Sequence, residues 1–110
     1  MRLKDKVIII TGSTMGIGKA IAIKFVSEGA KLVIHGLEKE LAENLRNILG
    51  KENCIFHVED LSNDGCSDRL VLLAIKKWNK IDGIVNNAAM GINFNIDNTD
   101  EKLLNEVLKV

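Results

Sequence analysis

The sequence predicts an α/β protein built on a doubly wound parallel sheet of about four strands in the order 3-2-1-4. Short runs of apolar, often β-branched residues alternate with amphipathic stretches of helical period along the 110 residues. The apolar runs lack a polar face, which is typical of strands covered by helices on both sides. Right-handed crossovers then give the order, because the chain winds outward through strands 2 and 3 and returns to place strand 4 on the other side of strand 1.

The first two strand and helix pairs lie in the N-terminal half. We expect a strand at residues 7–10, a helix over 17–28 that stops at Gly29, and a second strand at 31–35. A second helix follows and ends at Gly50. Its apolar stripe consists of Leu37, Leu41, Leu45, Ile48 and Leu49.

The same alternation continues through the C-terminal half. We expect a third strand at residues 54–58, a third helix over 63–78 and a fourth strand at 82–86. The inward positions of the third helix are Leu70, Leu73, Ala74 and Trp78. Thr99 is expected to cap a last helix over 100–110, whose first turn carries acidic residues where the helix dipole favours them.

Composition excludes several classes of partner. The 15 basic and 15 acidic residues cancel, and aromatic residues are 4% of the chain, so we expect no nucleic-acid binding. No apolar stretch approaches the ~18 to 20 residues that span a bilayer, and the N-terminus does not resemble a signal peptide. We therefore expect no membrane partner and a cytoplasmic location. No proline, repeat or linker marks a domain boundary.

Two cysteines and two histidines raise the question of a disulfide or a metal site. Cys54 and His57 are three residues apart in a predicted strand, so their side chains should point to opposite faces. The sequence also has no C-x-x-C pair. We expect Cys54 and Cys66 to be free, mostly buried thiols and predict no metal site.

The predicted strand order places two loops at one crevice, beyond the carboxyl ends of strands 1 and 4, where open α/β sheets bind ligands. The first loop reads Thr-Gly-Ser-Thr-Met-Gly-Ile-Gly over residues 11–18 and leads directly into a helix. Its glycines would let a phosphate approach the unpaired N–H groups of the helix N-terminus. A tight turn that merely requires glycine is the alternative. A Walker A loop is excluded, because its pattern needs glycine at Ser13 and Ser or Thr at Ala20.

The second loop reads Asn-Asn-Ala-Ala over residues 86–89. Its adjacent amides can bridge neighbouring strand ends, and its small residues let a flat ligand approach the backbone. An ordinary Asn-Asn turn is the alternative.

Together the two loops resemble the short-chain dehydrogenase/reductase family, whose cofactor loop reads T-G-x-x-x-G-I-G and whose fourth strand ends in N-N-A-G. The first motif matches in full over residues 11–18, and the second matches except that Ala89 replaces glycine. The resemblance runs along the whole chain. It implies a partial NAD(P)-binding Rossmann domain over residues 1–110, and an oxidoreductase that moves hydride to or from a carbonyl or alcohol.

The resemblance also implies the cofactor-binding residues, position by position. They are Gly12, Ser13, Thr14, Gly16, Ile17, Gly18, Asp60, Leu61, Asn87, Ala88 and Ala89. The members of the first loop would surround the pyrophosphate, the three after strand 4 would lie along the ribose, and Asp60 would meet the adenine ring. Thr11 would be structural, tying strand 1 to the loop after strand 4.

The choice between NAD and NADP stays open, with a lean to NADP. NAD users of this fold usually place an acid at the end of strand 2, where this chain has Gly36. The basic residues that NADP users tend to carry in the glycine loop and just after strand 2 are replaced by Met15 and Leu37. His35 and Lys39 are the nearby candidates for a 2′-phosphate, whereas Glu38 could instead take the ribose.

The resemblance breaks at the catalytic residues. The family pairs a tyrosine with a lysine and an upstream serine, and this chain has no tyrosine. Three interpretations follow: an N-terminal cofactor-binding portion, present as a fragment without activity of its own; an active oxidoreductase completed by a missing segment or partner chain; or a flavodoxin-like binding module. The flavodoxin-like module is disfavoured, because signalling receiver domains of that type use acidic residues after strand 1, where this chain has Gly12, Ser13 and Thr14. Strand 4 would be an unprotected apolar edge, so we expect a homo-oligomer or association with the missing half.

Overall fold

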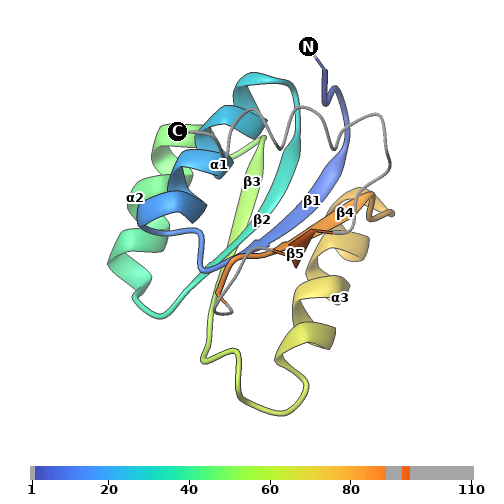
Figure 1. Ribbon diagram of the computed structural model, residues 1–110. Coiled ribbons are helices and arrows are strands. Elements are labelled where there is room, and N and C mark those ends of the chain that lie inside the picture. Colours follow the sequence, from blue (N-terminus) through green and yellow to red (C-terminus); the bar gives the residue numbers. More distant parts are fainter. Residues whose placement is uncertain (1, 89–92, 95–110) are drawn as a thin grey trace.

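The computed structural model describes residues 2–88 and 93–94 and has a five-stranded sheet in the order β3-β2-β1-β4-β5 (Figure 1). The strands are β1 (Val7–Thr11), β2 (Lys31–Gly36), β3 (Cys54–Val58), β4 (Gly83–Asn86) and β5 (Asn93–Phe94). The helices are α1 (Gly16–Ser27), α2 (Lys39–Leu49) and α3 (Cys66–Trp78). The first four strands pair in parallel, which confirms the predicted doubly wound order 3-2-1-4.

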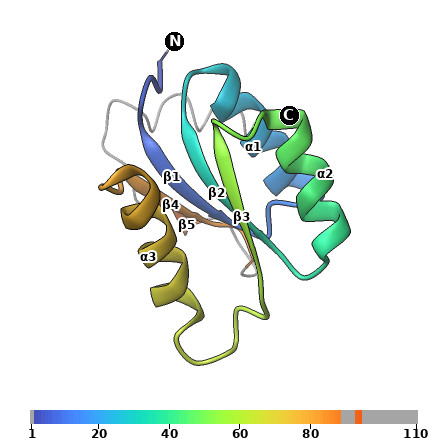
Figure 2. The ribbon, with the colours of Figure 1, turned by 180° about the vertical axis from the view of Figure 1, so that it is seen from behind.

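The molecule has three layers. Helices α1 and α2 cover one face of the sheet and α3 covers the other, as the front view and the view from behind both show (Figures 1 and 2). This placement follows from right-handed crossovers, which put the first two helices on one side and the third on the opposite side, because the chain turns back after β3 to place β4 beside β1. None of the helices within the described residues is long and apolar enough to cross a membrane.

Side chains of the central strands alternate between two apolar clusters, because successive residues of a strand point to opposite faces. On the α1 and α2 side, Ile8 and Ile10 pack with Phe25 of α1. On the α3 side, Val7 and Ile9 pack with Leu70. Both faces of β1 are therefore buried, which accounts for its uninterrupted apolar sequence.

Two details of the helices differ from the sequence prediction. Helix α2 begins at Lys39, so Leu37 precedes it and is 69% exposed, and Ile48 is 62% exposed. The buried face of α2 consists of Ala42, Leu45 and Leu49. Helix α3 begins three residues later than predicted, at Cys66, after Gly65 in the left-handed region with φ +81°. A residue without a side chain suits that turn, and the helix follows it.

The edge of the sheet beyond β4 also differs from expectation. The sequence does not predict β5, which pairs antiparallel with Val85 and Asn86, the last two residues of β4. The expectation of a wholly unprotected edge is therefore wrong at this end of β4, although the pairing covers only those two residues. The predicted helix over residues 100–110 and its cap at Thr99 lie outside the described residues.

Candidate functional site

A cavity of about 330 Å³ lies at the carboxyl ends of β1, β2 and β3. Its lining residues are Gly12, Thr14, Met15, His35, Gly36, Leu37, Glu38, Leu41, Asp60, Leu61 and Ala88. Five of them are residues that the sequence assigned to a cofactor site, namely Gly12, Thr14, Asp60, Leu61 and Ala88. The cavity has a volume within the range of small-molecule sites, and it lies where ligands bind in this type of sheet.

The glycine loop turns sharply into α1. Gly12 and Gly16 both have φ +60°, a backbone conformation that residues with a side chain rarely adopt. A Cβ added at Gly16 would meet no atom within 4 Å, so open space faces this residue. Gly16 and Ile17 begin the helix, and the N–H groups of a first turn have no acceptor within the helix. The start of α1 can therefore bind an anion.

Gly18 has a different role, because it is a point of close packing. A Cβ at this position would lie 2.3 Å from the Gly12 carbonyl oxygen and 2.5 Å from Nδ2 of Asn87. Only glycine lets α1 approach the loop so closely. Gly18 therefore shapes the turn, and it does not line the cavity.

Ser13 and Thr14 connect the loop to β2. Ser13 is fully buried, its hydroxyl accepts the N–H of His35 at 2.9 Å, and its own N–H donates to the His35 carbonyl at 2.8 Å. The side chain of Thr14 fills the space above Gly36, where a Cβ would lie 2.5 Å from Cγ2 and 2.6 Å from Oγ1 of Thr14. Thr14 thus occupies the position at the end of β2 where a side chain would otherwise stand.

The loop after β4 is tied to the glycine loop by side-chain hydrogen bonds. Thr11 Oγ1 accepts the N–H of Ala88 at 3.1 Å, which is the tie expected from the resemblance. Asn87 Nδ2 donates to the Gly12 carbonyl at 3.0 Å. The side chain of Asn87 is therefore engaged with the loop and does not line the cavity. Gly16 and Ile17 do not line the cavity either. The expected site residue Ala89 lies outside the described residues.

The two acidic residues after β3 have distinct surroundings. Asp60 lines the cavity and accepts hydrogen bonds from the hydroxyl and the N–H of Ser62 at 2.7 and 2.9 Å, which lower the pKa of its carboxyl. The guanidinium of Arg69 and then the imidazole of His57 hold the pKa of Glu59 well below its usual range. Both carboxyls are therefore ionised at neutral pH.

The structure brings three ligand-type groups together that the sequence analysis did not consider as a set. His57, Glu59 and Cys66 have ligand atoms within 4.8 Å of one another. Glu59 already accepts two hydrogen bonds from Arg69, one of them from Nε at 2.8 Å, and one from His57 at 2.7 Å. A cation would have to displace the guanidinium, so we interpret the group as an ion-pair network and assign it no metal.

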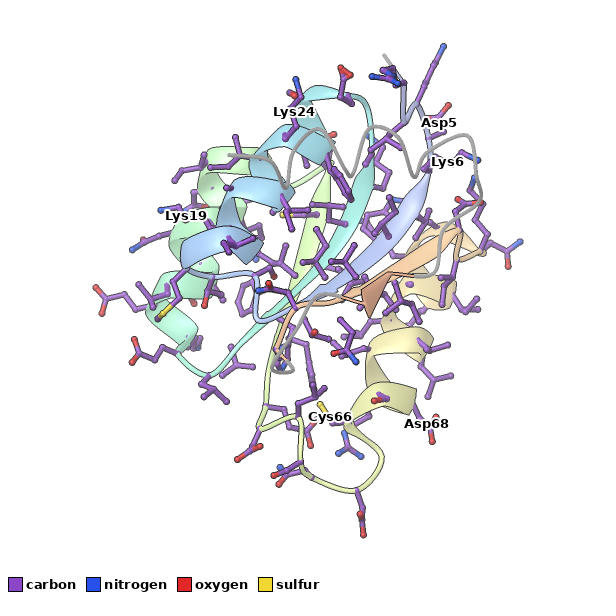
Figure 3. All side chains as sticks on the ribbon, viewed as in Figure 1. Asp5, Lys6, Lys19, Lys24, Cys66 and Asp68 are labelled. Carbon is purple, nitrogen blue, oxygen red and sulfur yellow. The ribbon has the colours of Figure 1, made fainter. Side chains whose placement is uncertain are left out.

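The cysteines are free and buried, as predicted. Burial raises the pKa of the Cys54 thiol to about 11 and also raises that of Cys66. Cys66 lies at the start of α3, on the opposite side of the sheet from Lys19 and Lys24 of α1 (Figure 3). Neither thiol has the lowered pKa of a nucleophile.

Six cavity residues are missing from the set that the sequence assigned to the site. They are Met15, His35, Gly36, Leu37, Glu38 and Leu41. His35, Gly36, Leu37 and Glu38 could have been predicted from the strand order. The end of β2 lies beside the end of β1, so residues 35–38 must border the same crevice. From the sequence, residues 35–38 were assigned to the choice between NAD and NADP, and Leu37 also to the apolar stripe of the second helix. Leu41 was assigned to the core, although it is half-buried and faces the cavity.

The fold and the site together define a class of protein: a doubly wound α/β domain with a glycine-rich loop at the point where the strand order reverses. Residues 6–110 match the family described as short chain dehydrogenase. The chain belongs to this family of oxidoreductases, as the glycine and Asn-Asn-Ala motifs indicate.

Known relatives are longer than this chain. NADP-dependent (R)-specific alcohol dehydrogenase from Lentilactobacillus kefiri is 36% identical over 110 residues, which cover 99% of this chain and 44% of that protein. Sorbitol dehydrogenase from Cereibacter sphaeroides is 38% identical over 90 residues, or 82% and 35% of the two chains. The chain spans less than half the length of the curated relatives it matches.

Solved structures of the family have the same fold. Glucose dehydrogenase of Caenorhabditis elegans in the apo form superposes with a TM-score of 0.76 and 36% identity, covering 83% of this chain and 40% of that one. A 3-ketoacyl-(acyl-carrier-protein) reductase from Brucella melitensis, complexed with NADH, gives a TM-score of 0.68 and 34% identity, covering 73% and 33%.

Proposed function

We propose that this chain is the NAD(P)-binding portion of a short-chain oxidoreductase, with residues 1–110 forming a partial Rossmann domain. The observation that carries the proposal is the cavity of about 330 Å³ at the ends of β1, β2 and β3, whose lining includes the N-cap residue Met15 of α1. An adenine dinucleotide has an anionic pyrophosphate at its centre and a flat adenine ring at one end. The start of α1 can bind the pyrophosphate, and the side chains of Leu41 and Leu61 can pack against the ring.

The pyrophosphate is assigned to the first turn of α1. The N–H groups of Gly16, Ile17 and Gly18 belong to this turn, and the helix dipole favours an anion there. The N–H of Gly12, in contrast, donates to Nδ1 of His35 at 3.0 Å, so Gly12 acts by shaping the turn. Ser13 supports the loop from β2, and Thr14 borders the cavity.

The remaining positions are assigned by their place around the cavity. Asp60 and Leu61 border the part formed by the end of β3, which we assign to the adenine ring. Ala88 borders the part next to the glycine loop, which we assign to the ribose together with its neighbour Ala89. Asn87 supports this arrangement through its hydrogen bond to the Gly12 carbonyl.

We infer that these 110 residues bind the cofactor without turning over a substrate. NAD(P) supplies the hydride, and an acid must protonate the developing alkoxide. The chain has no tyrosine. The ring nitrogens of His35 are engaged by Gly12 and Glu59, and Nε2 of His57 by Glu59. The alternative is an active oxidoreductase whose acid comes from a further segment or a partner chain.

Nicotinamide absorbance distinguishes these two cases. The purified chain is incubated with NADH or NADPH and a panel of ketones and acyl thioester ketones. We expect turnover at the background rate. Cofactor-dependent turnover by the chain alone would contradict the inference, and turnover that appears only when a longer segment or partner is supplied would support the alternative.

The choice of coenzyme turns on Glu38. One observation supports the lean to NADP: a relative named as NADP-dependent aligns with 99% of this chain. Against it, Glu38 and Asp60 line the cavity, and its lining within the described residues includes no lysine or arginine. The ammonium of Lys39 lies 3.8 Å from Glu43 instead. A carboxylate can accept hydrogen bonds from ribose hydroxyls and repels a 2′-phosphate.

Direct competition between NAD and NADP tests the lean, with Glu38→Gln as the matched variant. If Glu38 faces the ribose, this isosteric change raises the affinity for NADP relative to NAD by about tenfold, because it removes the repulsion between the Glu38 carboxylate and the 2′-phosphate. An unchanged ratio would exclude Glu38 as a determinant. Tighter binding of NAD than of NADP by the unmodified chain would end the lean to NADP.

Calorimetric titration tests the proposal as a whole. NAD, NADP, ADP-ribose and nicotinamide mononucleotide are each titrated into the 110-residue chain. We expect saturable binding of the three adenine compounds and much weaker binding of nicotinamide mononucleotide, because it keeps one phosphate for the start of α1 and lacks the adenosine to which the other assigned contacts belong. The absence of binding by all three adenine compounds would overturn the proposal.

A further inference from the structure

His35, at the end of β2, is buried and makes hydrogen bonds to two other strand ends. Its backbone exchanges hydrogen bonds with Ser13, whose N–H donates to the His35 carbonyl at 2.8 Å and whose hydroxyl accepts the His35 N–H at 2.9 Å. Its ring lies 3.0 Å from the N–H of Gly12 through Nδ1, and 2.7 Å from the carbonyl oxygen of Glu59 through Nε2. One side chain therefore links the loop after β1 to the end of β3.

Both ring contacts are to backbone groups, so the tautomer follows from geometry. The N–H of Gly12 can only donate, and Nδ1 must therefore be an unprotonated acceptor. The carbonyl of Glu59 can only accept, and Nε2 must therefore carry the proton. The neutral Nε2–H form is the one tautomer that satisfies both contacts.

The two backbone groups belong to opposite walls of the cavity. Gly12 lines it from the β1 side, and Glu59 directly precedes Asp60 and Leu61, which line it from the β3 side. The Gly12 carbonyl is held in addition by Asn87 at 3.0 Å. Side chains thus hold both backbone groups of Gly12, which adopts φ +60° and has no side chain of its own to restrict the turn.

We propose that His35 is a positioning residue of the dinucleotide cavity, acting through its Nε2–H tautomer to hold the Gly12 turn against the end of β3. The inference rests on the proposed function. His35 does not supply the phosphate contact itself, because its two ring nitrogens are engaged by the protein. The hydrogen bonds of His35 fix the orientation of the glycine loop and thereby the orientation of the start of α1.

Three substitutions separate the two ring contacts. His35→Asn keeps an acceptor near the position of Nδ1 and loses the contact to Glu59. His35→Gln keeps a donor near the position of Nε2 and loses the acceptor for Gly12. His35→Leu removes both. The matched control is His57→Leu, because His57 is the other histidine of the chain, pairs with His35 in the register of β2 and β3, and does not line the cavity.

The variants are compared by calorimetric titration with ADP-ribose, after thermal unfolding has shown that each is folded. We expect His35→Leu to bind about tenfold more weakly than the unmodified chain, consistent with the loss of buried hydrogen bonds. His35→Asn should recover most of the affinity, and His57→Leu should stay within about twofold. Equal affinity of His35→Leu and the unmodified chain would overturn the role of His35 and leave the proposed function standing. No binding by the unmodified chain would overturn both.

Nitrogen NMR of the unmodified chain gives a second readout that does not depend on any variant folding. The ring nitrogens of His35, distinguished from those of His57 by the spectrum of His57→Leu, should report an unprotonated Nδ1 and a protonated Nε2. The Gly12 amide should exchange slowly with solvent. A proton on Nδ1 of His35, or rapid exchange at Gly12, would contradict the proposal even if the dinucleotide binds.

Discussion

Met15 occupies the N-cap position of α1 but does not cap it. Its backbone is extended, with φ −152° and ψ 166°, as an N-cap residue requires, and its side chain makes no cap hydrogen bond. The side chain is 60% exposed, so it can be replaced without disturbing the core. Met15→Asp and Met15→Asn are nearly isosteric with each other, and each brings an oxygen that can accept an N–H of the first turn.

Both substitutions should raise stability, and Met15→Asp should in addition lower the affinity for the cofactor. A new cap stabilises a helix by about 1 kcal/mol, which corresponds to a rise of about 4–8 °C in Tm for a domain of this size. The Asp carboxylate gains about 0.3–1 kcal/mol more from the helix dipole. The same carboxylate, if roughly 5 Å from a bound phosphate, repels it by about 1–3 kcal/mol, which lowers affinity by about five- to a hundredfold.

Thermal unfolding and calorimetric titration with ADP-ribose on the unmodified chain and both variants measure these effects. We expect both variants to unfold at a higher temperature. Met15→Asp should bind ADP-ribose more weakly than Met15→Asn, and the difference should shrink as salt is added. Equal affinity of the Asp and Asn variants at low salt would refute the placement of an anion at the start of α1.

Three further predictions concern packing, pH and assembly. Gly18→Ala should lower the free energy of unfolding more than Gly16→Ala, because the new Cβ at position 18 would lie 2.3 Å from the Gly12 carbonyl oxygen. At position 16 the new Cβ would meet open space, and alanine there costs only about 1–2 kcal/mol of backbone strain. Urea titration that gives the reverse order would count against this packing. Arg69 lowers the pKa of Glu59, so the stabilising effect of the Glu59 carboxylate is complete above its unfolded-state pKa and is lost as the pH falls. At pH values below about 5 we expect Tm to decrease, and to decrease less in Glu59→Gln than in the unmodified chain. Equal acid sensitivity of the two proteins would exclude this contribution. Light scattering should detect a dimer or larger assembly, since β5 covers only two residues of β4, and a monomer at high concentration would contradict that expectation.

The sheet could be predicted because its signal is local. Each parallel strand is a short apolar run, and the third strand spans residues 54–58 in the prediction and in the structure alike. Helix boundaries were less accurate, because they depend on backbone turns that composition does not reveal. Leu37 continues the apolar period of α2, yet the chain enters the helix only at Lys39, so this side chain is left at the rim of the cavity.

The candidate site could be predicted in position but not in detail. The loops around Gly12 and Asn87 follow from motifs, and the strand order brings them together. The roles of Gly18 and Ser13 depend on tertiary contacts, since one packs against a carbonyl and the other bonds to a neighbouring strand. The links made by His35 join residues far apart in the sequence and have no local signature.

Amide NMR during a titration with NAD tests the central claim most directly, because it locates the bound dinucleotide on the chain. We predict saturable shifts at the amides of Gly16 and Ile17, at the start of α1, and at those of Leu37 and Leu61, which line the cavity. The amides of Leu72 and Ile75, exposed residues of α3, should not change. Saturable shifts confined to α3, or no saturable shift at the start of α1, would contradict the assignment of this cavity to the dinucleotide.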